Sequence, residues 1–497
     1  MEEIQSIDKD VDTHSIQLGK TPPTLTYFCV YNSSLSQSEE NTKDQILYYT
    51  AKKVVPADVK MKQVGLAQAL VNFTSAFSPS QLAQNVHTQK NRMVFLQPEE
   101  GFWIHMSIEL GILRRHIKDS KGKEKLVTEY LDASLNDRAL EAVLKVGYEQ
   151  FRLLNGTFAS LLYGEETSSP SKMPSRQHMR SLMHSIEEFF SDWIWKLDFD
   201  RLDTMVFSAV FNGVPSYPIL RSTYMRVHEL DQSIVDKFHS AIDHLVVLDA
   251  DEGSLVYRSP SISINDVCAL RKYILKRVEK GLAQDQEREK RLQERKLAAS
   301  KSDTKMSGFK LLTKSFSHAQ IFNYFSSSAS KSNLPIHSAP ISEANSTESI
   351  PSLPATSHIP PQPSSPTTAI PTTDMRMTQG KYLTGLVEDY CMDMDGEERC
   401  IARAEIVRVY LSSRSALENA STTPEPHDGL TEYFLVIYKH QSNLVWSFLL
   451  PSFSAEAQEM IVDASFYPSL ENHLIDQHIE PLTATVLENM QTAQEKR

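Results

Sequence analysis

The chain has 497 residues, of which 40% are hydrophobic and 23% are charged. At roughly 100 to 200 residues per domain, this length excludes a single compact domain, and the composition is that of a mainly globular protein. The 63 acidic side chains outnumber the 51 Lys and Arg side chains, and the net charge of -12 argues against generic nucleic-acid binding. The acidic N-terminus lacks the apolar core of a signal peptide, and no long apolar run follows, so neither secretion nor a membrane span is predicted.

The four cysteines are scattered along the chain and are too few for a disulfide framework or a four-thiolate zinc site. Cys29 and Cys268 lie in apolar patterns and are interpreted as small buried hydrophobic side chains. We therefore expect a reducing, cytoplasmic environment for this protein.

The first folded block mixes strands and helices. Apolar runs at residues 25–32 and 46–53 predict a β-hairpin, and apolar residues three to four apart predict a helix over 58–78, with Asp58 capping its first turn. Two more strands are predicted at 92–97 and 102–110, on either side of a turn. A further strand near 126–131 and a helix over 136–154 complete the block.

The next stretch repeats this mixture in a shorter form. A helix beginning at Arg176 is apolar nearly all round near its end, which favours an element wedged between two domains. Residues 203–217 predict a strand with an Asn-Gly turn, and residues 244–259 predict a hairpin followed by a helix over 264–278.

Composition changes sharply in the middle of the chain. Residues 279–314 hold ten Lys or Arg and six Asp or Glu, which is typical of a solvated helical extension. From Ser326 to Ile370 there are 13 Ser and 8 Pro in 45 residues, and such a segment cannot bury enough apolar surface to order itself. We expect a disordered linker there.

Beyond the linker, two hairpins are predicted, one pairing residues 381–390 with 400–411 and the other pairing 432–440 with 443–450. The tail that follows is helical in character and is interrupted by Pro468 and Pro481. Each folded block is therefore expected to be an α+β module, with an antiparallel sheet and a few helices.

Sequence motifs for catalysis or cofactor binding do not occur. The phosphate-binding GxxxxGK[ST], dinucleotide-binding GxGxxG and hydrolase GxSxG patterns are missing. His228 begins a metalloprotease-like pattern, but Gln232 stands where the second metal ligand is needed, and the Asp-containing turns at 249–253 and 391–396 lack a complete calcium-ligand set. No metal, cofactor or catalytic residue is predicted, so we expect the chain to act through its surfaces.

One segment between the folded blocks, residues 308–328, predicts an amphipathic helix. Its apolar residues recur three or four apart, while lysine and other polar residues face away. We expect a bilayer interface or a partner protein to cover the apolar face, and the alternative is a short helix docked on a neighbouring domain. The membrane-binding candidates are Phe309, Leu312, Phe316, Phe322 and Phe325.

The motifs HTQKNR at residues 87–92 and PEEGFWIHM at 98–106, with the opening TYFCVYN, resemble the Ccz family of vacuolar fusion proteins. The resemblance is strongest over residues 25–110. It implies three longin-like domains, each with an antiparallel sheet and flanking helices, which agrees with the three modules predicted above. Their expected limits are 21–165, 176–280 with a linking helix, and 380–497, with the extension and linker at 281–379.

The resemblance also implies a function. A Ccz protein pairs with a Mon-family subunit as a heterodimeric guanine-nucleotide exchange factor, which activates the late-endosomal and vacuolar Rab GTPase in vesicle-mediated transport, vacuole fusion and autophagy. Such a factor grips the switch loops of the GTPase and lowers its affinity for nucleotide, without covalent catalysis. We therefore expect a subunit that is not an enzyme in the covalent sense, peripheral on late-endosomal and vacuolar membranes.

The family-like motifs supply the candidates for partner contact. Residues 98–101 are expected to form a loop suited to contact, whereas Lys90 and Arg92 would meet an acidic partner or lie on a solvated strand edge. Phe102 and Trp103 alternate along a strand, so one is expected in the core and the other at the surface. The partner-binding candidates are Lys90, Arg92, Pro98, Glu99, Glu100 and Trp103.

Two other functions stay open at this point. A trafficking adaptor or tether would bind its partners stably without releasing nucleotide. A hydrolase or transferase with an unfamiliar site would need a polar cluster in a closed pocket, which the sequence does not reveal.

Overall fold

The computed structural model describes residues 16–36, 43–78, 82–118, 124–164, 174–202, 213–239, 241–310, 380–392, 398–412 and 429–496. The chain divides into two compact units, one formed by Met1–Gly281 with Ala369–Arg497 and the other by Leu282–Thr368. The predicted Ser- and Pro-rich linker and most of the strand predicted at 203–217 lie outside the described residues.

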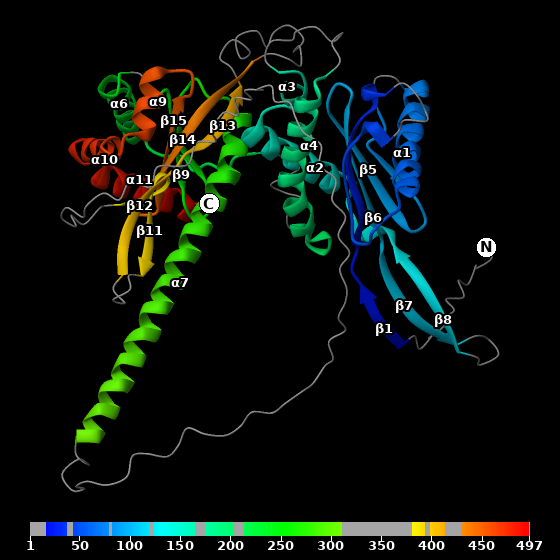
Figure 1. The fold of residues 1–497 in the computed structure, drawn as a ribbon, viewed down its shortest axis with the longest axis horizontal. Coiled ribbons are helices and arrows are strands. Elements are labelled where there is room, and N and C mark those ends of the chain that lie inside the picture. The colour runs from blue at the N-terminus through cyan, green and yellow to red at the C-terminus, as the bar shows by residue number, and fades with distance from the viewer. Residues whose placement is uncertain are drawn as a thin grey trace, which may run out of the picture. The chain divides into compact units, whose positions relative to one another are not determined.

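A five-stranded antiparallel sheet forms the first module, with the strand order β3-β2-β6-β5-β4 (Figure 1). The predicted hairpin is confirmed, because β2 pairs with β3, and the two strands predicted on either side of a turn are the paired strands β5 and β6. The strands are β2 (Thr24–Asn32), β3 (Ile46–Ala51), β4 (Asn85–His87), β5 (Asn91–Glu99) and β6 (Phe102–Glu109).

Helices cover both faces of this sheet. Helix α1 (Ala57–Phe77) lies on one face, and α2 (Asp137–Asn155), α3 (Phe158–Tyr163) and α4 (Arg176–Trp193) lie on the other (Figure 1). Phe102 packs in the core beneath α2 to α4, and Trp103 packs in the core beneath α1. The prediction that only one of these two residues is buried is therefore wrong, because the sheet has no solvated face at this point.

Helix α4 belongs to this first module. Its buried residues Leu182, Ile186 and Phe190 join the core of the five-stranded sheet, where the Phe190 ring lies 5.2 Å from that of Phe28. The prediction that this helix links two domains is corrected, since its apolar circumference is explained by packing against both the sheet and α2.

A small three-stranded sheet extends the first module, with the order β1-β7-β8. It contains the strand predicted near residues 126–131. Its strands are β1 (Ile16–Thr21), β7 (Gly111–Lys118) and β8 (Glu124–Leu131). Short 3-10 helices also occur at Ser33–Leu35, Asp132–Ser134, Ile194–Lys196 and Phe199–Arg201.

The remaining strands form one seven-stranded sheet, with the order β10-β9-β15-β14-β11-β12 and β13 added along β14. Strand β9 pairs with β15, so the strands of the second and third expected domains share a sheet, which corrects the expectation of a separate sheet in each. A lone two-stranded hairpin is marginally stable, and pairing with β15 provides the missing neighbour. The strands are β9 (His244–Asp249), β10 (Leu255–Arg258), β11 (Gly380–Met392), β12 (Glu398–Glu405), β13 (Val407–Ser412), β14 (Leu430–His440) and β15 (Leu444–Pro451).

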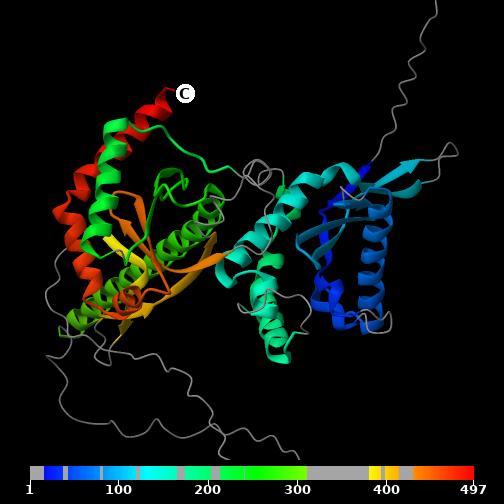
Figure 2. The same ribbon diagram turned by 90° about the horizontal axis from the view of Figure 1, so that it is seen from above.

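Helices also cover both faces of this second sheet. One face packs against α6 (Arg221–Lys237), α9 (Ala455–Val462), α10 (Phe466–Asp476) and α11 (Ile479–Glu495), and Figure 2 shows α6 and α11 side by side. The other face packs against the first turns of α7 (Ile264–Lys310). Pro468 and Pro481 lie in the first turns of α10 and α11, where proline is tolerated, so the helices break just before them.

Helix α2 contacts both modules of the larger unit. Gln150 donates to the carbonyl of Ala269 at 2.8 Å, and the Arg152 guanidinium lies 3.8 Å from the buried Asp266 carboxylate. Leu153 lies in the core beside α7. The helix predicted from the 136–154 pattern therefore has a second buried side.

Candidate partner-binding surface

The family-like motif at residues 87–92 forms the hairpin between β4 and β5. Thr88 closes this turn: its hydroxyl donates to the carbonyl of Asn91 at 2.7 Å and accepts from the amide of Asn91 at 2.9 Å. The amide of Leu110 donates to the carbonyl of Lys90 at 2.8 Å, which anchors the turn to the end of β6. The motif therefore specifies a tight, well-bonded hairpin.

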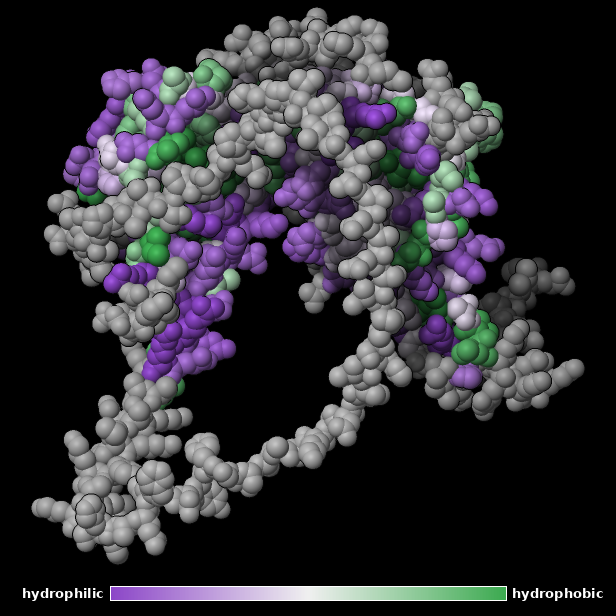
Figure 3. Space-filling view, in the orientation of Figure 1, coloured by the Kyte–Doolittle hydropathy of each residue, from purple (hydrophilic) through white to green (hydrophobic). Residues whose placement is uncertain are grey.

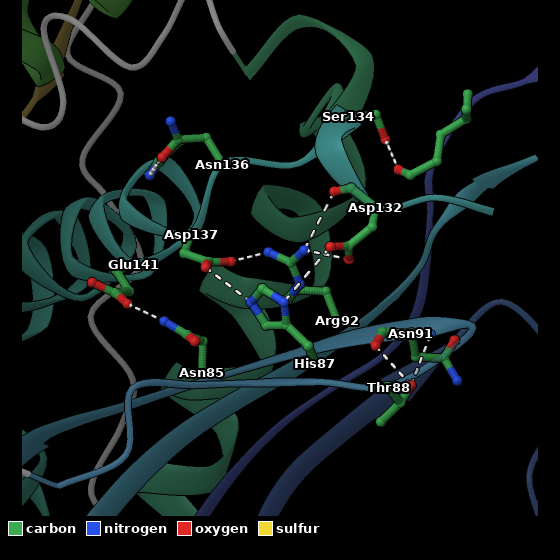
Figure 4. Close-up of polar contacts among 12 residues, drawn as sticks. Asn85, His87, Thr88, Asn91, Arg92, Asp132, Ser134, Asn136, Asp137 and Glu141 are labelled. Carbon is green, nitrogen blue, oxygen red and sulfur yellow. Dashed lines mark hydrogen bonds and ion pairs between the residues drawn. The ribbon is translucent and has the colours of Figure 1, made fainter. Parts of the chain in front are cut away.

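Arg92 lies at the centre of a polar cluster that joins this hairpin to the start of α2 (Figure 4). Its side chain is 2% exposed, and its guanidinium pairs with the carboxylates of Asp132, at 2.6 Å, and Asp137. The Nε2 atom of His87 lies 2.9 Å from the second oxygen of Asp137. Asn85 completes the cluster by donating to Glu141 at 2.8 Å.

The cluster has a structural role for the described chain. Asp137 stands in the first turn of α2, where a carboxylate is stabilised by the helix dipole, and Arg92 ties it to the sheet. A guanidinium that is buried and already paired with two carboxylates is not available to bind a second protein. The prediction that Arg92 contacts a partner is therefore corrected, and it is not on a solvated strand edge either.

Glu99 is also used inside the module. Its carboxylate accepts from the amides of Phe158 and Ala159, at 2.6 and 2.8 Å, and from the hydroxyl of Tyr148 at 2.5 Å. Glu99 thereby caps the N-terminus of α3. Burial of Tyr148 raises the pKa of its hydroxyl, and the negative charge of Glu99 raises it further. Strand β5 runs through Glu99, so the expected loop at 98–101 is reduced to Glu100 and Gly101.

The other partner-binding candidates divide by exposure. Lys90 and Glu100 are exposed, and the Lys90 ammonium lies 5.9 Å from the centre of the Tyr130 ring. Pro98 is half-buried, and Trp103 is buried against α1. Only Lys90, Glu100 and part of Pro98 are therefore presented to a partner by the chain as it stands.

Most of the predicted membrane-binding residues lie beyond the end of α7. Phe309 falls within the last turn of α7, and Leu312, Phe316, Phe322 and Phe325 lie outside the described residues. Among the helices that the structure describes, none is both long and apolar enough to cross a bilayer. The same part of the chain contains no group of three or more His, Cys, Asp or Glu side chains arranged to hold a metal ion.

A surface that was not predicted from the sequence lies on the outer side of α1. Four large apolar residues follow one side of the helix at spacings of seven, seven and four, and their exposed fractions run from 41% to 74%. Hydrophobic and hydrophilic side chains alternate over this outer helix in Figure 3. We call these residues the α1 stripe: Val59, Leu66, Phe73 and Phe77.

Helix α1, which carries the α1 stripe, contacts the outer strand of the sheet. Strand β3 lies at one end of the strand order and, within the described ranges, pairs with β2 alone. The hydroxyl of Tyr49 on β3 donates to Gln63 of α1 at 2.6 Å, and Lys60 lies 4.9 Å from the Tyr49 ring centre. An open strand edge beside an apolar helix face is a combination that a second protein domain can cover.

The signal for the α1 stripe was present in the sequence. The buried side of α1 is marked by Val64, Ala67 and Val71, whereas Leu66 and Phe73 fall on the opposite side of the helix. A helix with apolar residues on two opposite sides is either buried all round or meets a partner. Only the structure shows that its second side faces outward.

Comparison with known proteins assigns the first module. Residues 25–156 match the family described as the first longin domain of INTU, CCZ1 and HPS4. Relatives named "Vacuolar fusion protein CCZ1 homolog" include one from Xenopus tropicalis, 28% identical over 230 residues, which are 46% of this chain and 44% of the relative. Another from Nematostella vectensis is 30% identical over 235 residues, 47% of this chain and 46% of the relative.

A more distant relative with the same name, from Dictyostelium discoideum, is 26% identical over 264 residues, or 52% of this chain and 53% of the relative. The chain thus spans about half the length of the curated relatives it matches. The resemblance to the Ccz family is confirmed, as is the α+β class with antiparallel sheets flanked by helices. Residues 25–156 are thus similar to the first longin domain of INTU, CCZ1 and HPS4, and the chain is similar over about half its length to the CCZ1 homologues.

Proposed function

We propose that this chain acts in vacuole fusion as one subunit of a heterodimeric guanine-nucleotide exchange factor, together with a Mon-family subunit. The pair would activate the late-endosomal and vacuolar Rab GTPase in vesicle-mediated transport and autophagy. The names of the relatives support the fusion role, and the exchange role rests on the family resemblance. On this proposal the chain is cytoplasmic and peripheral on late-endosomal and vacuolar membranes.

The observation that carries the proposal is the α1 stripe beside the open edge of β3. Phe73 and Phe77 are 64% and 74% exposed, which is costly in water and is relieved when a partner covers them. A longin-type partner domain offers a helix and a strand of its own, so it can match both features together. We place the Mon-family subunit on this side of the sheet.

The mechanism requires no reactive group from this chain. The assembled pair would bind the nucleotide-free form of the GTPase more tightly than the nucleotide-bound form, and this difference in affinity shifts the GTPase towards nucleotide release. The polar cluster around Arg92 has a structural role rather than a catalytic one, since its residues hold the hairpin to α2.

Release of a fluorescent guanine nucleotide from the vacuolar Rab tests the proposal. The chain alone and the Mon-family subunit alone should leave the rate near its intrinsic value, and the mixture should raise it. If the mixture forms a stable complex and release stays at the intrinsic rate, the adaptor or tether function replaces the exchange function.

A further inference from the structure

A groove with a volume of about 480 Å³ lies in the second module, between β10, the start of α6 and the residues just before that helix. Tyr217 and Ile219 line it from the segment before α6, Arg221 and Tyr224 from α6, and Tyr257 and Arg258 from β10. Its size is in the range of sites that take a small molecule or a few side chains of a peptide. It is separate from the α1 stripe.

The floor of this groove is fixed by buried hydrogen bonds. The hydroxyl of Tyr257 donates to the carboxylate of Asp231 at 2.7 Å and lies 2.9 Å from Nδ1 of His228. Ser259 donates to the same carboxylate at 2.9 Å, and the Tyr257 ring lies 5.3 Å from the ring of Tyr224. A groove whose walls are already ordered loses little conformational entropy when a ligand binds.

The charge of the lining is opposite to that of the protein. Among the residues that the structure describes, two arginines and no carboxylate line the groove, in a chain with a net charge of -12. Arg258 is held in place by the carbonyl of Ile262 at 2.5 Å, whereas Arg221 is exposed at the first residue of α6. The nearby carboxylate of Glu252 accepts from the hydroxyl of Tyr217 at 2.6 Å. The lining therefore favours a ligand that carries negative charge.

The position of the groove favours an extended peptide. Strand β10 is the outer strand of its sheet, and an isolated bridge between Ser216 and Leu255 joins it to the segment before α6. A flat bilayer surface cannot enter a groove bounded by two walls, whereas a peptide side chain can. Tyrosine and arginine together are also the residue types that most often dominate binding energy at protein interfaces.

We propose that this groove binds an extended acidic segment of a partner protein, with one apolar side chain seated between Ile219 and Tyr224 and neighbouring carboxylates facing Arg221 and Arg258. This binding is independent of the exchange activity, because it uses neither the α1 stripe nor β3. It gives the chain a second interaction surface for a partner with complementary charge.

Fluorescence anisotropy with the full chain tests this proposal. The probe is a fluorescein-labelled ten-residue peptide with four Glu or Asp residues around two Leu residues, and the comparison peptide has Lys in place of the acids. The acidic peptide should bind, and Arg221→Glu should weaken its binding by about tenfold, the loss of one charge-assisted contact. Arg221→Lys should retain most of the affinity.

Arg226→Glu is the matched control, because it makes the same charge change on an exposed residue of α6 outside the groove lining. It should change the affinity less than about twofold, since surface charges act weakly at a distance. An equal loss for Arg226→Glu would overturn the proposal in favour of nonspecific attraction, and so would failure of the acidic peptide to bind. Loss of binding to phosphatidylserine vesicles by Arg221→Glu, with peptide binding unchanged, would reassign the surface to membranes.

Discussion

The rings of Phe73 and Phe77 lie 5.0 Å apart on the outer side of α1, edge to face, although both side chains are mostly exposed. Covering one large apolar side chain is worth about 1.5–3 kcal/mol, so the α1 stripe can supply a large part of the binding energy of a complex. Exposed aromatic pairs of this kind are typical of the centre of a protein interface.

Substitution within the α1 stripe should weaken association without unfolding the chain. Leu66→Asp and Phe73→Asp each place a charge where the partner is expected to exclude water, and each should raise the Kd for the Mon-family subunit by about tenfold or more. Asn72→Asp introduces the same side chain at an exposed neighbouring position of α1 and should leave the Kd within about twofold, because surface charges contribute little. Calorimetric titration measures the Kd, and a thermal melt should show that all three variants stay folded.

Substitution of Arg92 should lower the stability of the chain rather than its affinity for a partner. Arg92→Leu leaves the carboxylates of Asp132 and Asp137 without their cation and should lower the free energy of unfolding by about 2–4 kcal/mol. Asp132→Asn should cost less, because Asp132 is 58% exposed. Urea unfolding measures both. A loss of partner affinity with unchanged stability would restore Arg92 as a contact residue.

Stability should also depend on pH through one core histidine. His105 is fully buried between Tyr27, whose hydroxyl lies 2.8 Å from Nε2, and the carbonyl of Val94, 3.1 Å from Nδ1. The carbonyl requires a proton on Nδ1, so Nε2 accepts from Tyr27 and the ring is neutral. Burial lowers the pKa of His105 from 6.5 to about 4.

The folded state resists protonation of His105. The neutral His105 ring therefore makes its full contribution to the free energy of unfolding above pH 6.5, and this contribution is lost as the pH falls towards 4. The loss at pH 4.5 relative to pH 7 should be about 2–3 kcal/mol. Urea unfolding of the parent chain and of His105→Asn at pH 4.5 and pH 7 isolates the contribution of His105, because all other titratable groups are the same in the two proteins. Parallel pH dependence of the two proteins would contradict the assignment.

The amphipathic segment predicted at 308–328 leads to a separate prediction. Changing Phe316 and Phe322 to Asp should lower binding of the assembled complex to liposomes, because inserted apolar area drives such binding. Exchange measured in solution should be unaffected. Unchanged liposome binding would favour docking of this segment on protein.

Local patterns predicted most of the elements, since strands such as β2 and β6 and helices such as α2 carry clear periodicity. Pairing between distant segments was not predictable in this way. Strand β9 joins β15 across almost two hundred residues, and a hairpin pattern does not specify which further strand will pair with it.

In the candidate site, too, local patterns were predictable from the sequence and contacts between distant segments were not. The alternation rule placed Phe102 and Trp103 on opposite faces correctly, but it could not indicate that helices cover both faces. The charges of Lys90 and Arg92 look equivalent in sequence, and only Arg92 meets two carboxylates brought from beyond β8. The α1 stripe required the observation that one apolar side of the helix is left exposed.

We propose that this chain promotes nucleotide release from the vacuolar Rab by pairing with a Mon-family subunit through the α1 stripe. The most direct measurement is the release rate of a fluorescent guanine nucleotide in the presence of both subunits, at concentrations near the Kd of the parent pair. We predict a clear acceleration with the parent chain and with Asn72→Asp, and a rate near the intrinsic value with the double variant Leu66→Asp and Phe73→Asp. Full acceleration by the double variant would contradict the claim.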